Sequence, residues 1–127
     1  MTKILAVALG GAVGSTGRYL TSLAVSSATA SRFPYETLTV NLAGSFLIGL
    51  LWGYFERMPI SNEFRLFLFT GVLGGFTTFS TFARENVQFL KAGEMGSAVA
   101  YLLISNFFGL CLVGTGFYLS TLLVQSH

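Results

Sequence analysis

Hydrophobic residues run through this chain in four long segments, which short polar stretches separate. Each segment reaches the roughly 20 residues that an α-helix needs to span a bilayer. The stretches between them, "SRFPYE", "ERMPISNEFR" and "KAGEMG", hold prolines and charges. The pattern predicts an all-α membrane protein with four transmembrane helices in a single domain over residues 1–127. The expected helices cover residues 4–29, 35–55, 64–90 and 96–124.

The amino-acid composition is that of a membrane protein. Apolar residues make up 53% of the chain and charged residues only 9%, whereas about 25% of the residues in a typical soluble protein are charged. So little charge could not cover the surface of a soluble domain. The net charge of +2 is too small to indicate a nucleic-acid partner. The sequence contains no G-x-x-x-x-G-K-[ST] motif, so we expect no nucleotide.

The residue types that build most enzyme active sites are scarce. The chain has no aspartate, and we expect its single histidine, His127, to have neither a catalytic nor a metal-binding role. The single cysteine, Cys111, lies in an apolar run and is expected to be a packing residue. No nucleophile–base pair or metal-ligand cluster is evident, so we expect a protein that is not an enzyme.

The first apolar segment also resembles a signal peptide. Lys3 precedes the apolar run, and "ATA" at residues 28–30 resembles a cleavage site. The run is longer than the apolar core of a typical signal peptide, and Arg18 interrupts it. We therefore favour a membrane helix.

The positive charges give almost no preferred orientation in the membrane. If the segments alternate in direction, Lys3, Arg57 and Arg65 lie on one side, and Arg32 and Lys91 lie on the other. The positive-inside rule then has three residues against two to act on. Either other features set the orientation, or the chain inserts both ways and forms an antiparallel dimer.

Small residues suited to close helix packing recur along the chain. Gly10 and Gly14 are four residues apart, and Gly49 and Gly53 repeat that spacing. These pairs pack helices either of one chain or of two subunits. Four helices can hardly enclose a polar pathway and shield it from lipid, so such a pathway would need a partner subunit.

Several polar residues fall at bilayer depth, where they are costly and are candidates for a functional site. Arg18 either reaches the interface or pairs with a glutamate of a connecting stretch, or it anchors a vestibule or attracts an anion. Asn41, within "TLTVNLAGSF", either bonds a neighbouring helix or donates hydrogen bonds in a pore. Tyr101 and Ser105 share one helical face, where they form a track of donors unless the tyrosine is only an interface anchor.

The stretch "GGFTTFSTF", residues 74–82, is the least expected sequence in a membrane helix. A glycine in a helix interior costs about 1 kcal/mol relative to alanine. A broken helix at this depth is tolerated where its freed backbone lines a cavity or meets a partner, and freed carbonyls can hold a cation. Phe79 and Phe82 lie on one helical face. They either pack in the core or against lipid, or turn their electropositive ring edges toward an anion.

These motifs resemble the Fluc family of small bacterial fluoride channels. Four stretches carry the resemblance: "GGAVGSTGRY" at 10–19, "TLTVNLAGSFLIG" at 37–49, "GVLGGFTTFSTFARE" at 71–85 and "YLLISN" at 101–106. The resemblance implies an antiparallel, dual-topology homodimer with two separate fluoride pathways and a third helix that is broken midway. It also implies a structural Na⁺ buried at the dimer centre, held by the main-chain carbonyls of Gly74 and Thr77 of both subunits.

The resemblance further assigns residues to the pathway. Arg18 would lie at the vestibule, and Glu85 near the far end of the third segment. Where the family often has further small hydroxyl residues on the fourth segment, this chain has Gly109. The residues implied for the fluoride pathway are Asn41, Phe79, Ser80, Thr81, Phe82, Tyr101 and Ser105.

The expected function is therefore passive, fluoride-selective transport that exports fluoride across the bacterial inner membrane. Neutral donors suit this task, because a pore must replace the hydration of fluoride without binding it too tightly. One alternative is a small proton-coupled multidrug exporter, which would need a carboxylate in an early membrane helix, and the first segment has none. Another is a membrane scaffold subunit, which would leave "GGFTTFSTF" unexplained.

Overall fold

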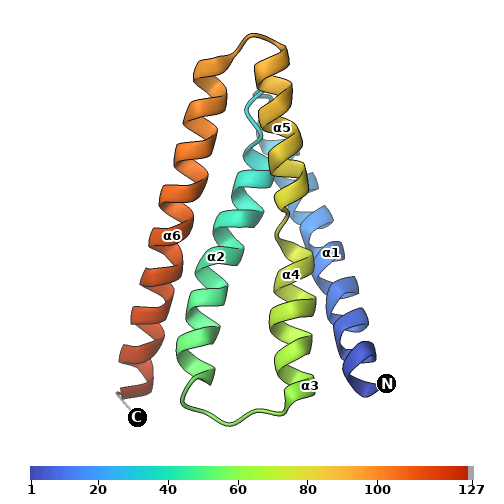
Figure 1. Ribbon diagram of the computed structural model, residues 1–127, viewed down its shortest axis with the longest axis vertical. Coiled ribbons are helices and arrows are strands. Elements are labelled where there is room, and N and C mark those ends of the chain that lie inside the picture. The colour runs from blue at the N-terminus through green and yellow to red at the C-terminus, as the bar shows by residue number, and fades with distance from the viewer. Residues whose placement is uncertain (126–127) are drawn as a thin grey trace.

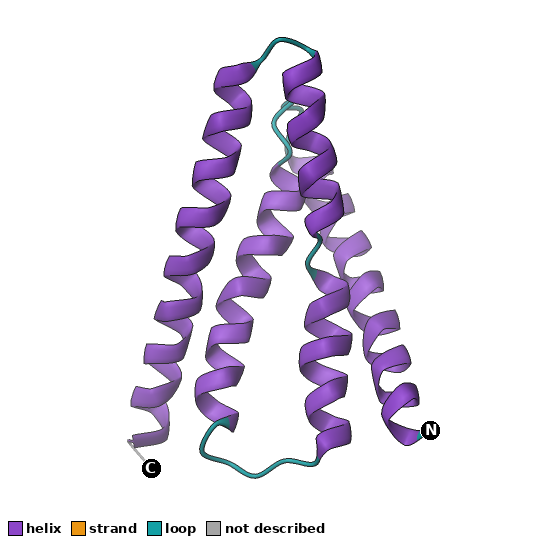
Figure 2. Ribbon diagram, in the orientation of Figure 1, coloured by secondary structure: helices purple, strands orange, loops and turns teal. Residues whose placement is uncertain are grey.

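The computed structural model describes residues 1–125, and every regular element in that range is helical (Figures 1 and 2). The prediction for His127 lies outside the described residues. The elements are α1 (Thr2–Ala28), α2 (Tyr35–Phe55), α3 (Asn62–Arg65), the π-helix η1 (Leu66–Leu73), α4 (Gly74–Phe76), α5 (Phe79–Lys91) and α6 (Met95–Gln125).

Three of the described helical segments are long and apolar enough to cross a membrane. They are Tyr35–Phe55, Asn62–Lys91 and Met95–Gln125, and the second of them runs from α3 through α5. Helix α1 has sufficient length but is not among them, because glycines, hydroxyl residues and Arg18 lower its mean hydropathy. The chain is thus built as a helical membrane protein.

The helices form an elongated bundle that narrows toward one end. In Figure 1, α1 and α6 form the two edges, and between them lie α2 and the span Asn62–Lys91, called the third segment below. The helices converge at the end that carries the α1–α2 and α5–α6 loops, and they spread toward the end that carries both chain termini. The narrow end therefore brings together loops that are about 60 residues apart in sequence.

Glycines let α1 lie directly against the first half of the third segment. A Cβ added to Gly10 would collide with the carbonyl of Phe67, and one added to Gly14 would collide with the carbonyl of Val72. Gly71 faces back onto Gly10 in the same contact. This first small-residue pair therefore packs two helices of one chain.

Helices α2 and α6 approach each other in the same manner. A Cβ on Gly49 would meet the carbonyl of Val113, and one on Gly53 would meet the hydroxyl of Ser120. Gly116 supplies the corresponding gap on α6. The second small-residue pair also packs within the chain, so both pairs that the sequence left open have intrachain contacts.

The buried core is small and lies toward the narrow end. Large apolar side chains elsewhere are exposed: Leu110 by 75% and Phe107 by 63%. Such surfaces suit a chain that contacts lipid or a second subunit rather than water. The core residues are Phe82, Phe89, Ala98 and Tyr101, with Phe33 and Leu38 packed against them.

Helix α5 ends in a turn that requires a glycine. Gly93 has a φ of 76°, which glycine adopts readily and other residues rarely do. The Gly93 N–H donates to the carbonyl of Leu90 (3.1 Å), and the Glu94 N–H donates to that of Phe89 (2.8 Å). This is the Schellman pattern of a helix C-terminus. It fixes Glu94 directly before the first turn of α6.

Candidate functional site

The site is built around a short interruption between α4 and α5, which Figure 2 shows as a loop within the third segment. Thr77 and Thr78 are extended, with φ and ψ of −87° and 159°, and of −147° and 119°. Helix α5 begins at Phe79 with Thr78 as its N-cap, whose side chain accepts from the Thr81 N–H. Gly74 and Gly75 remain helical. The two threonines, rather than the two glycines, therefore form the interruption.

Asn41 of α2 holds this interruption in place. Its Nδ2 donates to the Thr78 carbonyl (3.0 Å), and its Oδ1 accepts from the Thr78 N–H (2.8 Å). One amide side chain thus gives the Thr78 N–H an acceptor in place of its helical one and adds a donor to the Thr78 carbonyl. The second hydrogen on Nδ2 stays available for a ligand. Of the two interpretations that the sequence left open for Asn41, the structure shows the interhelical contact directly.

The interruption diverts two amides from their helical acceptors. In a continuous helix the Thr78 N–H would donate to the Gly74 carbonyl, and the Thr81 N–H would donate to the Thr77 carbonyl. Here the first donates to Asn41 and the second to the Thr78 hydroxyl (3.4 Å). The main-chain oxygens of Gly74 and Thr77 are consequently left without their usual helical donors. They are the two carbonyls that the family resemblance implied for a cation.

Arg18 joins α1 to the end of α4. Its Nε donates to the Gly75 carbonyl at 3.0 Å, and the residue is half-buried. The bond neutralises part of the negative end of the short helix. Arg18 lies beside the interruption but does not line the pocket described below.

A pocket of about 420 Å³ lies between α2, both halves of the third segment and α6. It gathers four of the residues predicted for the pathway and both residues predicted for the cation. It also includes Thr78 and Asn106, for which the sequence suggested no role. The lining residues are Asn41, Gly44, Ser45, Ile48, Phe69, Leu73, Gly74, Thr77, Thr78, Phe79, Phe82, Ser105 and Asn106.

Ser105 brings an unused hydroxyl to the pocket. Its Oγ is buried and has no hydrogen-bond partner among the described residues. Buried polar groups are nearly always paired, so an exception calls for an explanation. The Ser45 hydroxyl, by contrast, donates to the carbonyl of Asn41 at 2.8 Å. Ser105 is therefore the lining hydroxyl that is free to serve a ligand.

Two phenylalanines that line the pocket, Phe79 and Phe82, differ in how far they are exposed. The ring centroids of Phe79 and Phe82 are 5.9 Å apart, and the ring planes are tilted by 46°. Phe82 is buried, whereas Phe79 is 79% exposed. The edge-to-face contact of Phe82 with Tyr101, at 4.9 Å and 60°, connects the pocket to the core.

Tyr101 belongs to a separate polar cluster. Its hydroxyl donates to Glu85 Oε1 (3.0 Å), and the Thr37 hydroxyl donates to Glu85 Oε2 (3.1 Å). Tyr101 and Thr37 are buried, so one carboxylate joins α2, α5 and α6 within the bundle. Sequence reasoning placed Glu85 near the end of the third segment but missed this cluster. The signal that could have found it is the spacing, because Glu85 shares a helical face with Phe82 and Phe89.

The remaining predicted residues lie at the edge of this arrangement. Ser80 is exposed on α5 and does not line the pocket, and Thr81 accepts a hydrogen bond from the Thr78 hydroxyl (3.2 Å). A Cβ on Gly109 would lie 3.6 Å from the Ser45 hydroxyl. Ser45 therefore stands across from the position where the fourth segment lacks a hydroxyl.

The described residues contain no group of three or more histidine, cysteine, aspartate or glutamate side chains that could hold a metal ion. Any cation at this site would therefore rely on main-chain oxygens and on hydroxyls.

The chain is similar in sequence to known proteins over nearly its whole length. Residues 5–117 match the family model described as "CrcB-like protein, Camphor Resistance (CrcB)". A protein of Desulfotalea psychrophila is 53% identical over 117 residues, which cover 92% of this chain and 91% of that protein. One of Thermus thermophilus is 47% identical over 124 residues, 98% and 99% of the two chains. One of Flavobacterium psychrophilum is 44% identical over 117 residues, 91% and 94%. All three are named "Fluoride-specific ion channel FluC".

Proposed function

This chain belongs to the CrcB family, and from that premise we propose that it is a fluoride-selective channel that exports fluoride passively across the bacterial inner membrane. The names of its relatives support a fluoride channel. The observation that carries the proposal is the pocket at the interruption, because its polar lining consists of neutral groups.

Those groups match the requirements of a small, strongly hydrated anion. A pore must replace the water around fluoride with donors, yet release the ion again. Asn41 keeps one N–H free after holding Thr78, and Ser105 keeps its hydroxyl free. A fixed lysine or arginine in the same place would bind fluoride too tightly for rapid transport. The edges of Phe79 and Phe82 add weak positive potential without a full charge.

The pathway proposed for fluoride has two parts. Ser105, Asn41 and the two phenylalanines line the pocket, and Phe82 leads from it to Tyr101. Arg18 supplies positive charge near the vestibule. Ser80 and Thr81 remain proposed members, with Thr81 the nearer of the two to the interruption.

The functional unit is proposed to be an antiparallel, dual-topology homodimer with two pathways. Each chain would contribute four transmembrane helices: the three apolar spans and, in addition, α1. The exposure of Phe79 and the large apolar exposed area of the single chain support a second subunit that covers the pocket. The near balance of positive charge between the two sides supports insertion in both directions.

The residues at the interruption fit a sodium ion at the centre of such a dimer. The carbonyls of Gly74 and Thr77 have lost their helical donors, and oxygen is the ligand that hard cations prefer. Two subunits would bring together both pairs of carbonyls. A bound Na⁺ would supply positive charge that stabilises the interrupted backbone.

The test is ion flux from liposomes that contain the purified protein. Fluoride efflux is read with a fluoride electrode and compared with chloride efflux from matched vesicles. The proposal predicts rapid fluoride efflux, little chloride efflux and no need for ATP or a proton gradient. A folded protein that passes no fluoride would overturn it, and the same liposomes would then be assayed for proton-coupled drug uptake.

A further inference from the structure

A second pocket, of about 310 Å³, lies at the narrow end of the molecule, where the α1–α2 loop meets the end of α5. Its lining includes Arg32, Glu85, Gln88, Phe89 and Glu94. Two carboxylates therefore face this pocket. Arg32 is the one positively charged residue among the described residues that line it.

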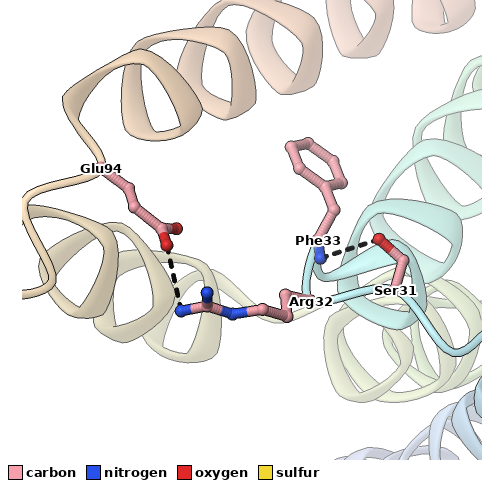
Figure 3. Close-up of polar contacts among 4 residues, drawn as sticks. All are labelled: Ser31, Arg32, Phe33 and Glu94. Atoms are coloured by element: carbon pink, nitrogen blue, oxygen red, sulfur yellow. Dashed lines mark hydrogen bonds and ion pairs between the residues drawn. The ribbon is translucent and has the colours of Figure 1, made fainter.

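Arg32 and Glu94 both line the pocket, and Figure 3 shows the Arg32 side chain extended toward the Glu94 carboxylate. Its Nη2 lies 3.0 Å from Glu94 Oε1, although the Arg32 side chain is 81% exposed and that of Glu94 is 32% exposed. An ion pair this exposed contributes little to stability and opens readily. The guanidinium is thus held at the rim of the pocket and remains accessible to an ion in water.

The neighbouring Phe33, rather than the ion pair, anchors the loop. Its ring contacts Tyr101 edge-on at 5.4 Å and Phe89 at 6.2 Å, and its N–H bonds the Ser31 hydroxyl (3.1 Å). These contacts fix the backbone next to Arg32. Loss of the Arg32 charge would therefore leave the loop in position.

The second pocket leads inward to the first through one layer of side chains. Glu85 lines the second pocket and accepts the Tyr101 hydroxyl bond. The Tyr101 ring contacts Phe82, which lines the first pocket. The contacting residues Glu85, Tyr101 and Phe82 thus connect the two pockets.

We infer that the second pocket is the mouth of the fluoride pathway at the narrow end of the molecule, and that Arg32 is the residue that recruits the anion to it. This inference rests on the proposed function. Glu85 and Glu94 carry two formal negative charges that repel an approaching anion. Arg32 offsets one of them at the rim, and its pairing with Glu94 limits how much of its charge the anion meets.

The test compares Arg32→Gln with Lys91→Gln in the liposome flux assay. Lys91 is exposed, lies at the same end of the molecule and lines neither pocket, so it matches the change in net charge. At low fluoride and about 10 mM salt, Arg32→Gln is expected to reduce flux about threefold relative to wild type, the effect of one unit charge several ångströms from the ion in water. Lys91→Gln is expected to reduce flux less than Arg32→Gln, because its charge lies outside the pocket and the Coulomb energy in water falls with distance.

Two further measurements separate recruitment from a structural role. At about 1 M salt the difference between Arg32→Gln and wild type should disappear, because the Debye length falls to about 3 Å. Glu94→Gln should raise flux at low fluoride and low salt, since it removes a repelling charge and frees Arg32. A purely structural ion pair would make both variants slower at every salt concentration.

The outcomes distinguish this inference from the function on which it rests. If wild type passes no fluoride, the channel proposal fails. If wild type conducts but Arg32→Gln and Lys91→Gln behave alike, or Glu94→Gln is slower than wild type, only the role of Arg32 is overturned. Should Arg32→Gln not fold, the response of Glu94→Gln alone decides the matter.

Discussion

At the scale of single residues, the polar side chains at the interruption have different roles. Asn41 uses one donor and one acceptor to bond Thr78, whereas the hydroxyl of Ser105 has no hydrogen-bond partner among the described residues. Asn41 thus holds the fold and keeps one N–H for a ligand, whereas Ser105 is free for a ligand alone. A substitution at Asn41 should lower both stability and flux, and one at Ser105 should lower flux alone.

Asn41→Ala is expected to lower the free energy of unfolding by about 1–3 kcal/mol, because it removes two hydrogen bonds and leaves the Thr78 N–H unpaired. Thermal unfolding in detergent measures the change. Asn106→Ala is the matched control, since that amide is exposed and bonds only the Leu102 carbonyl of its own helix. Equal destabilisation by both substitutions would contradict the role given to Asn41.

Ser105→Ala is expected to leave unfolding within about 0.5 kcal/mol of wild type, because no hydrogen bond within the chain is lost. Fluoride efflux should fall about tenfold, the effect of one lost hydrogen bond to a charged ion. Ser45→Ala serves as a comparison, since its hydroxyl is already bonded to Asn41. Unchanged efflux in Ser105→Ala would remove that residue from the pathway.

At the scale of the elements, the helix pairs depend on close backbone contact. Gly14 has the Val72 carbonyl where a Cβ would be, whereas Gly11 of the same helix has nothing within 4 Å of that position. The interruption in the third segment is held on one side by this packing and on the other by α2. The glycines of α1 therefore position the site without contributing a side chain to it.

Gly14→Ala is expected to destabilise the protein by about 1–3 kcal/mol through overpacking. Gly11→Ala should be neutral or stabilise by up to about 1 kcal/mol, since alanine is the better helix former. The pair is measured by thermal unfolding in detergent. A similar effect of both substitutions would show that α1 does not pack as described.

The sequence predicted the extent of the helices well and the details of the site less completely. The expected helix at 35–55 coincides with α2, and both limits of each of the other three expected helices lie within two residues of those observed. The interruption was expected at "GGFTTFSTF", from its glycines and threonines together. Thr77 and Thr78 form it, because the Thr78 side chain caps α5 and its backbone bonds Asn41, which is 37 residues away.

Long-range contacts account for what the sequence could not reveal. The Glu85 cluster joins Thr37, 48 residues away, to Tyr101, 16 residues away. No local pattern encodes such pairings, and the π-helix over Leu66–Leu73 likewise has no clear local signal. The roles proposed for the pathway residues and for the sodium ligands stay predictions.

At the scale of the whole molecule, the single chain leaves its candidate site open on one side. Phe79 is 79% exposed at the pocket, and Gly74 is exposed beside it. A second, inverted copy would cover both residues. Whether this side of the site is closed therefore depends on how the two copies are oriented in the membrane.

Dual topology predicts that about half of the copies present either end to each side of the membrane. A Lys91→Cys variant, made with Cys111→Ser so that it carries one thiol, is labelled in sealed vesicles with a membrane-impermeant maleimide. About half of the protein should react before the vesicles are permeabilised. Labelling of nearly all or nearly none would contradict insertion in both directions.

Fluoride efflux through Phe82→Ile, compared with efflux through Phe107→Ile, tests whether the ion passes along the pocket at the interruption. Both substitutions replace a phenylalanine in a membrane helix, but Phe82 lines the pocket at the interruption and Phe107 is exposed on α6 outside it. If fluoride passes along the pocket, Phe82→Ile should lose most of its efflux while Phe107→Ile keeps it. Both variants should elute from a size-exclusion column as folded protein. Equal efflux through the two variants would contradict a pathway at this site.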